Sequence, residues 1–89
     1  PADHERTMMP APIRVLCVDD HPLVREGISL VIERDPGIRV VGAVSSGEEA
    51  LACYPALRPD VTLMDLQLGG MSGTEAIAAL RLVDPAARI

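Results

Sequence analysis

The chain has 89 residues, enough for a single small domain with one hydrophobic core. Hydrophobic residues are 48% and charged residues 24% of the sequence, which excludes a disordered chain. The net charge is −5 and there is no basic stripe, so the segment lacks the electrostatic footprint of a nucleic-acid-binding protein. No apolar run approaches the ~20 residues that cross a bilayer, and no signal-peptide pattern is present, so we expect a cytoplasmic protein.

Residues 1–12 contain three prolines and show no hydrophobic period, which predicts a disordered tail or an expression remnant ahead of a domain over residues 13–89. The two cysteines, Cys17 and Cys53, lie inside apolar stretches and lack metal-binding spacing. We therefore expect both to be small, buried side chains without a disulfide.

From Ile13 onward, apolar runs rich in β-branched residues alternate with segments of helical period. Nearly continuous apolar runs are typical of strands buried on both faces of a parallel sheet. The predicted elements are, in chain order, a strand over 13–18, a helix from 22 to the break at 35–37, a strand over 38–44, a helix opened by a capping box within 45–49 and ended by Pro59, a strand over 60–65, a helix over 74–83, and the entry to a fourth strand at 86–89.

Strands that alternate with helices predict an α/β fold with a doubly wound parallel sheet, right-handed crossovers and helices on both faces. Helical spacing also predicts which side chains of the last two helices face the core. These expected core positions are Ala50, Leu51, Tyr54, Leu57, Ile77, Leu80 and Val83.

Acidic residues end two of the predicted strands. Asp19 and Asp20 follow the first strand, and Asp65 ends the third. Ligands of open parallel sheets bind beyond the carboxyl ends of the strands, so we expect these three carboxylates to meet if the two strands are neighbours. Carboxylate oxygens are the ligands that Mg²⁺ prefers, and a carboxylate beside Mg²⁺ can attack phosphorus to form an aspartyl-phosphate. The sequence therefore predicts a pocket for phosphoryl transfer.

Three separated segments resemble the CheY-like receiver domain of response regulators. They are VLCVDDHPLVREGI at 15–28, DVTLMDLQL at 60–68 and MSGTEAI at 71–77. The run DDHPLVREG is further similar to the NarL/FixJ subgroup, whose receivers usually precede a LuxR-type DNA-binding domain. The resemblance covers residues 13–89 and implies a three-layer, flavodoxin-like (βα)5 sheet of strand order 2-1-3-4-5, of which three strand-and-helix units and the start of strand four are present.

The resemblance implies that Asp65 accepts a phosphoryl group from a sensor histidine kinase to control transcription. It also implies that Asp20, Asp65 and the backbone carbonyl of Gln67 bind Mg²⁺ directly and that Asp19 does so through water. The domain is expected to be regulatory rather than an enzyme, with weak self-dephosphorylation possible only in the complete domain. In the family a Ser or Thr after strand four and a Lys after strand five complete the site, and both positions would lie beyond Ile89.

Two departures from the family pattern leave alternatives open. The chain contains no Lys, although Arg81 or Arg88 could approach the pocket, and Gly69 stands where the family usually has Pro, so we expect a looser loop after Asp65. The alternative function is a degenerate receiver that acts as a phosphorylation-independent interaction or dimerisation module. A haloacid-dehalogenase-type phosphatase would need a DxD motif, and a dinucleotide-binding fold would need a phosphate-binding loop after the first strand.

Several expectations concern the surroundings of the pocket and the partners of the domain. His21 precedes Pro22 and has no His or Cys at ligand spacing, so we expect it to position the loop, while Asp20 could alternatively cap the first helix. Glu48 and Glu49 are expected to form a solvated first turn. Without strands four and five, strand three would be an open apolar edge, which predicts a homodimer or higher self-association. DNA contact is expected only through a C-terminal domain.

Overall fold

The computed structural model describes residues 11–89, which form three strands and three helices in alternation. The elements are β1 (Ile13–Val18), α2 (Pro22–Ile32), β2 (Ile38–Val44), α3 (Gly47–Leu57), β3 (Val61–Met64) and α4 (Gly73–Val83). Of the tail predicted over residues 1–12, residues 1–10 lie outside the described part, and Ala11 and Pro12 are exposed without regular structure. None of the helices within residues 11–89 is both long enough and apolar enough to span a membrane.

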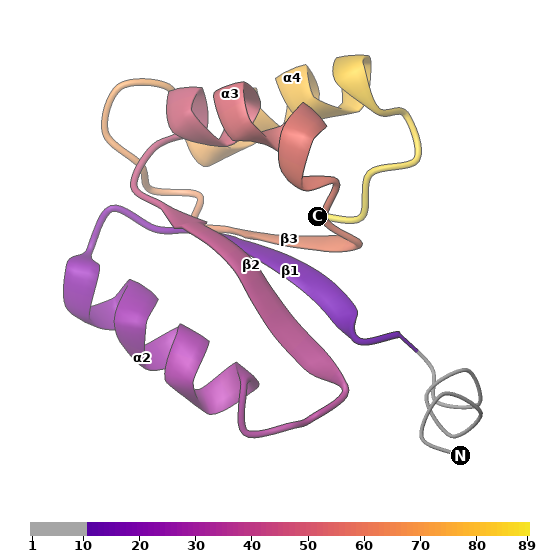
Figure 1. Ribbon diagram of the computed structural model, residues 1–89. Coiled ribbons are helices and arrows are strands. Elements are labelled where there is room, and N and C mark those ends of the chain that lie inside the picture. Colours follow the sequence, from indigo (N-terminus) through magenta and orange to yellow (C-terminus); the bar gives the residue numbers. More distant parts are fainter. Residues whose placement is uncertain (1–10) are drawn as a thin grey trace.

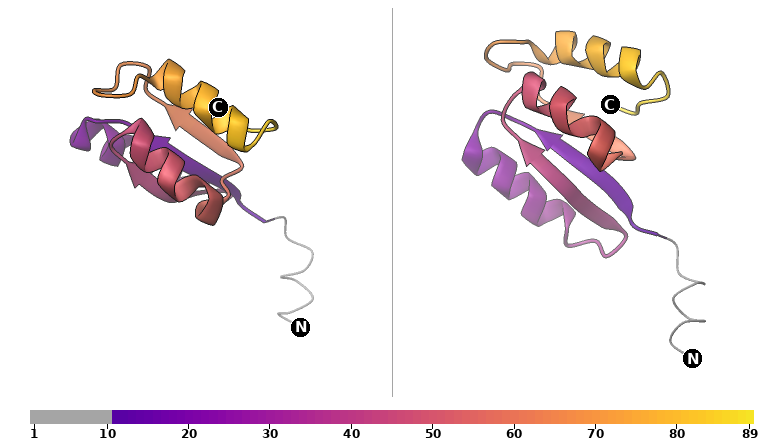
Figure 2. Two further views of the ribbon diagram at one scale, coloured as in Figure 1. Left: turned by 90° about the horizontal axis from the view of Figure 1, so that it is seen from above. Right: turned by 45° about the horizontal axis from the view of Figure 1, so that its top comes forward.

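The three strands form one parallel sheet in the order β2-β1-β3. Figure 1 shows α2 on one face of this sheet and α3 and α4 on the other, and the turned views of Figure 2 agree. The predicted doubly wound, three-layer α/β architecture is thus confirmed for these elements. Because β1 is the central strand, its last four residues are buried on both sides.

Strand register brings the carboxyl ends of the strands to the same edge of the sheet. Val18 at the end of β1 lies opposite Val44 of β2 and Met64 of β3. The next backbone groups continue this pairing: the N–H of Asp19 donates to the carbonyl of Val44 at 3.1 Å, and the N–H of Asp65 donates to the carbonyl of Val18 at 3.0 Å. The segments that follow β1 and β3 therefore start next to each other at this edge of the sheet.

Serine residues form the N-caps of both α3 and α4. Ser46 caps α3 by accepting from the N–H of Glu49, but the Glu49 carboxylate accepts from the N–H and hydroxyl of Ser45 instead of closing a box on Ser46. These hydrogen bonds lower the pKa of Glu49. The reciprocal capping box is found at α4, between Ser72 and Glu75, and the sequence analysis had placed one only at α3.

The core lies between the sheet and the α3–α4 layer, and it includes the predicted Ala50, Tyr54 and Leu80. Val83 was wrongly expected in this core. It is 58% exposed, because it borders an open hollow between the ends of α3 and α4 that no side chain fills. Ala76, which was not among the expected core positions, is fully buried one turn before Leu80. The amphipathic helix α2 contains no buried residue, since only one of its sides packs on β1 and β2.

Tyr54 provides a test of this packing, because it is the sole aromatic residue of the chain. Its hydroxyl donates to Oδ2 of Asp84 at 2.8 Å, and burial together with the Asp84 carboxylate raises the pKa of Tyr54 to about 12. The folded state thus favours the neutral phenol over tyrosinate. This preference adds to the free energy of unfolding in full below pH ~10, and the added stability is lost as the pH rises toward 12. We expect the near-ultraviolet absorbance of tyrosinate to appear only near pH 12, and at lower pH in Asp84→Asn. Titration of the folded protein near pH 10 would contradict this packing.

Candidate functional site

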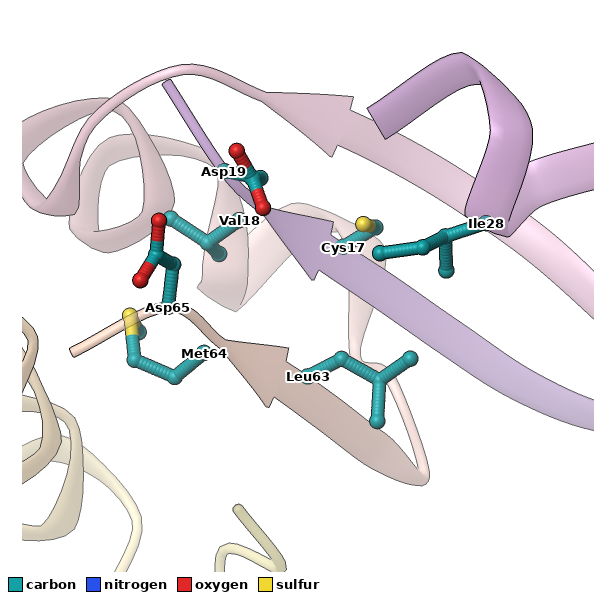
Figure 3. A pocket seen from close by; sticks show the side chains of 7 residues that line it. All are labelled: Cys17, Val18, Asp19, Ile28, Leu63, Met64 and Asp65. Atoms are coloured by element: carbon teal, nitrogen blue, oxygen red, sulfur yellow. The ribbon is translucent and has the colours of Figure 1, made fainter. Parts of the chain in front are cut away.

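The candidate site lies where β1 and β3 end. Asp19 follows β1 and is 8% exposed, and Asp65 follows β3 and is partly buried. Figure 3 shows both carboxylates beyond the strand arrowheads, at one rim of a pocket of about 390 Å³. The rest of this pocket is apolar, lined by Cys17, Val18, Ile28, Leu63 and Met64.

The predicted convergence of three carboxylates is present in the structure. Asp19, Asp20, His21 and Asp65 each offer one ligand atom, and these four atoms lie within 4.8 Å of one another. Carboxylate oxygens are the preferred ligands of hard divalent cations, and three carboxylates so close together repel one another without such an ion. The chemistry of this donor set therefore fits Mg²⁺.

His21 organises the turn between β1 and α2. Its backbone N–H donates to Oδ1 of Asp19 at 2.8 Å, which supports the expected role in positioning the loop. Its ring was not expected in the cluster, yet Nδ1 lies 2.9 Å from Oδ1 of Asp20 and 3.3 Å from Oδ1 of Asp19. The N-cap of α2 is His21 without a side-chain hydrogen bond, so the alternative that Asp20 caps this helix is wrong.

Arg25 is a cationic residue of the site that the sequence analysis missed. Its Nη1 donates to the backbone carbonyl of Asp19 at 2.7 Å and so fixes the end of β1. Its position one helical turn after His21 could have indicated this contact. Arg88, which was considered as an alternative cation, accepts from the N–H of Thr62 with its own carbonyl, at the opposite end of β3 from Asp65.

The loop after Asp65 is held by two acidic side chains. Oδ1 of Asp65 accepts from the N–H of Gln67 at 2.9 Å, which keeps Gln67 next to the carboxylate. Glu48 is exposed in the first turn of α3, as expected, and its Oε1 also accepts from the N–H of Met71 at 2.9 Å, which ties α3 to this loop. The family usually has Pro at the position of Gly69. Here the loop is held two residues later, by the hydrogen bond from the N–H of Met71 to Glu48.

Gly73 lets α4 begin directly against the backbone of Asp65. A Cβ added at Gly73 would overlap with the carbonyl oxygen of Asp65 and would lie 2.5 Å from Cα of Leu66. Only glycine permits an approach of this kind. The position of Asp65 thus depends on the start of α4.

Cys17 lines the same pocket from β1 and carries a free thiol. Burial raises its pKa, and the negative charge of Asp19 adds to this effect. Cys53 in α3 is also a free thiol, with a pKa raised by burial. Both shifts favour the neutral thiol. Cys17 is buried, as expected, whereas Cys53 is only half-buried, on the side of α3 that packs against the core.

Comparisons with known proteins agree with this geometry. The family model of the response regulator receiver domain matches residues 15–89. Response regulator GacA of Pseudomonas viridiflava is 50% identical over 68 residues, which cover 76% of this chain and 32% of that protein. The nitrate/nitrite response regulator protein NarL of Escherichia coli (strain K12) is 41% identical over 70 residues, which cover 79% of this chain and 32% of that protein.

Solved structures show the same relationship in three dimensions. A two-component response regulator of the LuxR family from Aurantimonas sp. SI85-9A1 has a TM-score of 0.85 and 46% identity, and the match covers 89% of this chain and 56% of that one. The chain thus spans about a third of the length of the two curated relatives. By its sequence, its sheet order and its acidic pocket, the chain belongs to the response regulator receiver domain family, among relatives of the NarL and LuxR type.

Proposed function

We propose that Asp65 accepts a phosphoryl group from a sensor histidine kinase of a two-component system. The observation that carries this proposal is the meeting of the Asp19, Asp20 and Asp65 carboxylates at one edge of the sheet, within reach of a single ion. Receiver domains generally bind Mg²⁺ at such an acidic pocket. Here Asp20, Asp65 and the backbone carbonyl of Gln67 would hold Mg²⁺ directly, and Asp19 would hold it through water.

The hydrogen bonds of the pocket support separate tasks for the two oxygens of Asp65. Oδ1 accepts from Gln67, whereas Oδ2 accepts no hydrogen bond from any of the described residues. Oδ2 therefore donates its electron pair to phosphorus, and the bond from phosphorus to the imidazole nitrogen of the kinase breaks as the new bond forms. Mg²⁺ held by Asp20, Asp65 and the carbonyl of Gln67 would neutralise part of the negative charge that gathers in this step.

Residues of β2 and α2 keep Asp19 in place during this step. The N–H of Asp19 donates to the carbonyl of Val44, and the guanidinium of Arg25 donates to the carbonyl of Asp19. Because the backbone of Asp19 is fixed on both sides, its carboxylate would need little reorganisation to hold Mg²⁺ through water.

Radiolabelled acetyl phosphate tests the phosphoacceptor. We expect weak labelling of the 89-residue chain, which contains no Lys, and stronger labelling of a chimera that continues after Ile89 with the remaining residues of Pseudomonas viridiflava GacA. Borohydride trapping and peptide mass spectrometry should locate the label on Asp65, and removal of Mg²⁺ by a chelator should abolish it. A label on another residue, or a yield independent of Mg²⁺, would refute the proposal.

The relatives also suggest an output for the signal. LiaR of Bacillus subtilis (strain 168), 45% identical over 75 residues, is a transcriptional regulatory protein. We propose that phosphorylation of Asp65 controls a LuxR-type DNA-binding domain on the same regulator and so controls transcription. The residues described here would act as the regulatory switch, and DNA contact would come from that domain alone.

We further propose that the 89-residue chain self-associates through β3 and the sheet face beside it. β3 is an edge strand of the sheet, and Leu63 and Ile28 line an open apolar pocket next to it. We expect light scattering to show a dimer or higher oligomer, and we expect Leu63→Glu to shift it toward the monomer. Leu82→Glu, at an 87% exposed position of α4, is the matched control and should change nothing. A wild-type monomer at all concentrations would refute self-association.

A second candidate is a receiver that acts as an interaction module without phosphotransfer, and it is favoured by Gly69, which stands where the family usually has Pro. The two candidates differ in their dependence on Asp65. Self-association that is equal in Asp65→Asn and wild type, combined with no labelling of the chimera, would favour the interaction module.

A further inference from the structure

We infer that His21 is a nitrogen ligand of the acidic pocket, and that the pocket therefore takes borderline divalent ions such as Ni²⁺, Co²⁺ or Zn²⁺ more tightly than its carboxylates alone would. This inference rests on the metal-binding part of the proposed function. It adds a ligand that the sequence comparison with receiver domains does not assign.

The distances around Nδ1 of His21 fit neighbouring ligands of one ion. Nδ1 lies 2.9 Å from Oδ1 of Asp20 and 3.3 Å from Oδ1 of Asp19. A six-coordinate ion with bonds of about 2.1 Å places adjacent ligand atoms about 3.0 Å apart. Nδ1 also lies within 4.8 Å of the ligand atom that Asp65 offers from β3. A single ion can thus contact donors from both strand ends and from His21.

The backbone of His21 explains why its ring stays at the pocket although 68% of the side chain is exposed. The N–H of His21 is bound to Oδ1 of Asp19, and its carbonyl accepts from the N–H of Arg25 at 2.9 Å in the first turn of α2. Pro22 follows directly and restricts the backbone further. The residue therefore has a fixed backbone from which the ring reaches the two carboxylates.

The chemistry of the ring determines which ions benefit. Without metal, Nδ1–H donates to the carboxylates; with a metal, the neutral ring that carries its proton on Nε2 presents a lone pair at Nδ1 instead. Imidazole suits Ni²⁺, Cu²⁺, Fe²⁺ and Zn²⁺, whereas carboxylates and water suit Mg²⁺ and Mn²⁺. Loss of the ring should therefore weaken Ni²⁺ binding far more than Mg²⁺ binding.

Calorimetric titration of the 89-residue chain with Ni²⁺ alone and with Mg²⁺ alone tests this difference. Removal of residues that only support a metal ligand typically costs 10–100-fold in affinity, so His21→Gln should weaken Ni²⁺ binding by at least about tenfold. The same change should leave Mg²⁺ affinity within about twofold. His4→Gln removes the other histidine of the chain and is the matched control, expected to change neither affinity.

Pulsed electron paramagnetic resonance of the Cu²⁺-loaded chain gives an independent readout of the ligand atom, because imidazole suits Cu²⁺. We expect a directly bound ¹⁴N coupling in wild type and His4→Gln, and its loss in His21→Gln. The inference is overturned if this coupling is absent from wild type, if His21→Gln weakens Ni²⁺ no more than Mg²⁺, or if Asp65→Asn leaves Ni²⁺ affinity unchanged. Failure of the wild-type chain to bind any of these ions would overturn the metal-binding part of the proposed function as well.

Discussion

Replacement of Asp65 by asparagine is expected to reduce covalent labelling by acetyl phosphate to background while the fold remains intact. Asparagine retains an Oδ1 that can accept from the N–H of Gln67, so the loop keeps its hydrogen bond. It loses the second carboxylate oxygen and the negative charge, and an amide nitrogen does not attack phosphorus. The substitution therefore separates the nucleophile from its structural support.

The same substitution should leave the free energy of unfolding unchanged or raise it by up to about 1 kcal/mol, because one of three clustered negative charges is removed. Far-ultraviolet circular dichroism during urea unfolding measures this in the 89-residue chain, and labelling is measured in the GacA chimera. Glu33→Gln removes one charge at the far end of α2 and is the matched control. Labelling that survives in Asp65→Asn would assign the phosphoacceptor to another residue.

Local sequence patterns predicted the elements well where those patterns arise from burial. The strands over 13–18 and 38–44 have the predicted bounds, because β-branched apolar runs end where charged residues or serines begin. The third strand is shorter than predicted, Val61–Met64 instead of 60–65. Asp60 lies beside β1, where its N–H donates to the carbonyl of Arg14 at 2.7 Å and its carboxylate accepts from the N–H of Arg14 at 2.8 Å. A polar residue at a strand end thus shortens the strand in a way that an apolar pattern does not show.

The candidate site was predicted as a set of carboxylates, and its supporting contacts were not. Asp19, Asp20 and Asp65 could be placed together because the carboxyl ends of neighbouring parallel strands share an edge. The bond from Arg25 to Asp19 and the bond from Glu48 to Met71 depend on how a helix turn faces a distant loop. Such contacts are set by tertiary packing, and neither hydrophobic period nor residue spacing encodes them.

The glycines near the site show the same division between local and tertiary information. Gly69 attracted attention because it departs from the family pattern, yet a Cβ there would meet no atom within 4 Å. The sequence analysis did not single out Gly73, yet a Cβ there would overlap with the backbone of Asp65 and Leu66. The position at which a side chain larger than glycine does not fit is thus identified by the structure alone.

Gly73→Ala is therefore expected to lower the free energy of unfolding by about 3 kcal/mol or more, at or above the upper end of the usual cost of overpacking. The new Cβ meets backbone atoms, which cannot move aside as the end of a flexible side chain can. Since small domains have a total stability of only about 5–15 kcal/mol, a large part of it would be lost. Urea unfolding followed by circular dichroism measures the change.

Two other glycines of the same loop provide graded controls. Gly69→Ala should stay within about 0.5 kcal/mol of wild type, because its Cβ enters open space. Gly70→Ala should cost about 1–2 kcal/mol, because Gly70 has a φ of 68° in the left-handed region. Equal stability of the Gly73 and Gly69 variants would refute the close approach of α4 to Asp65.

The Gly73 variant should also affect the metal pocket, since the atom in conflict is the carbonyl oxygen of Asp65 itself. Relief of the overlap must displace either α4 or the end of β3. Displacement of β3 moves the Asp65 carboxylate away from Asp19 and Asp20, so Mg²⁺ affinity should fall even under conditions where the variant is fully folded. Full Mg²⁺ affinity in folded Gly73→Ala would instead show that α4 moves and that the pocket keeps its geometry without this contact.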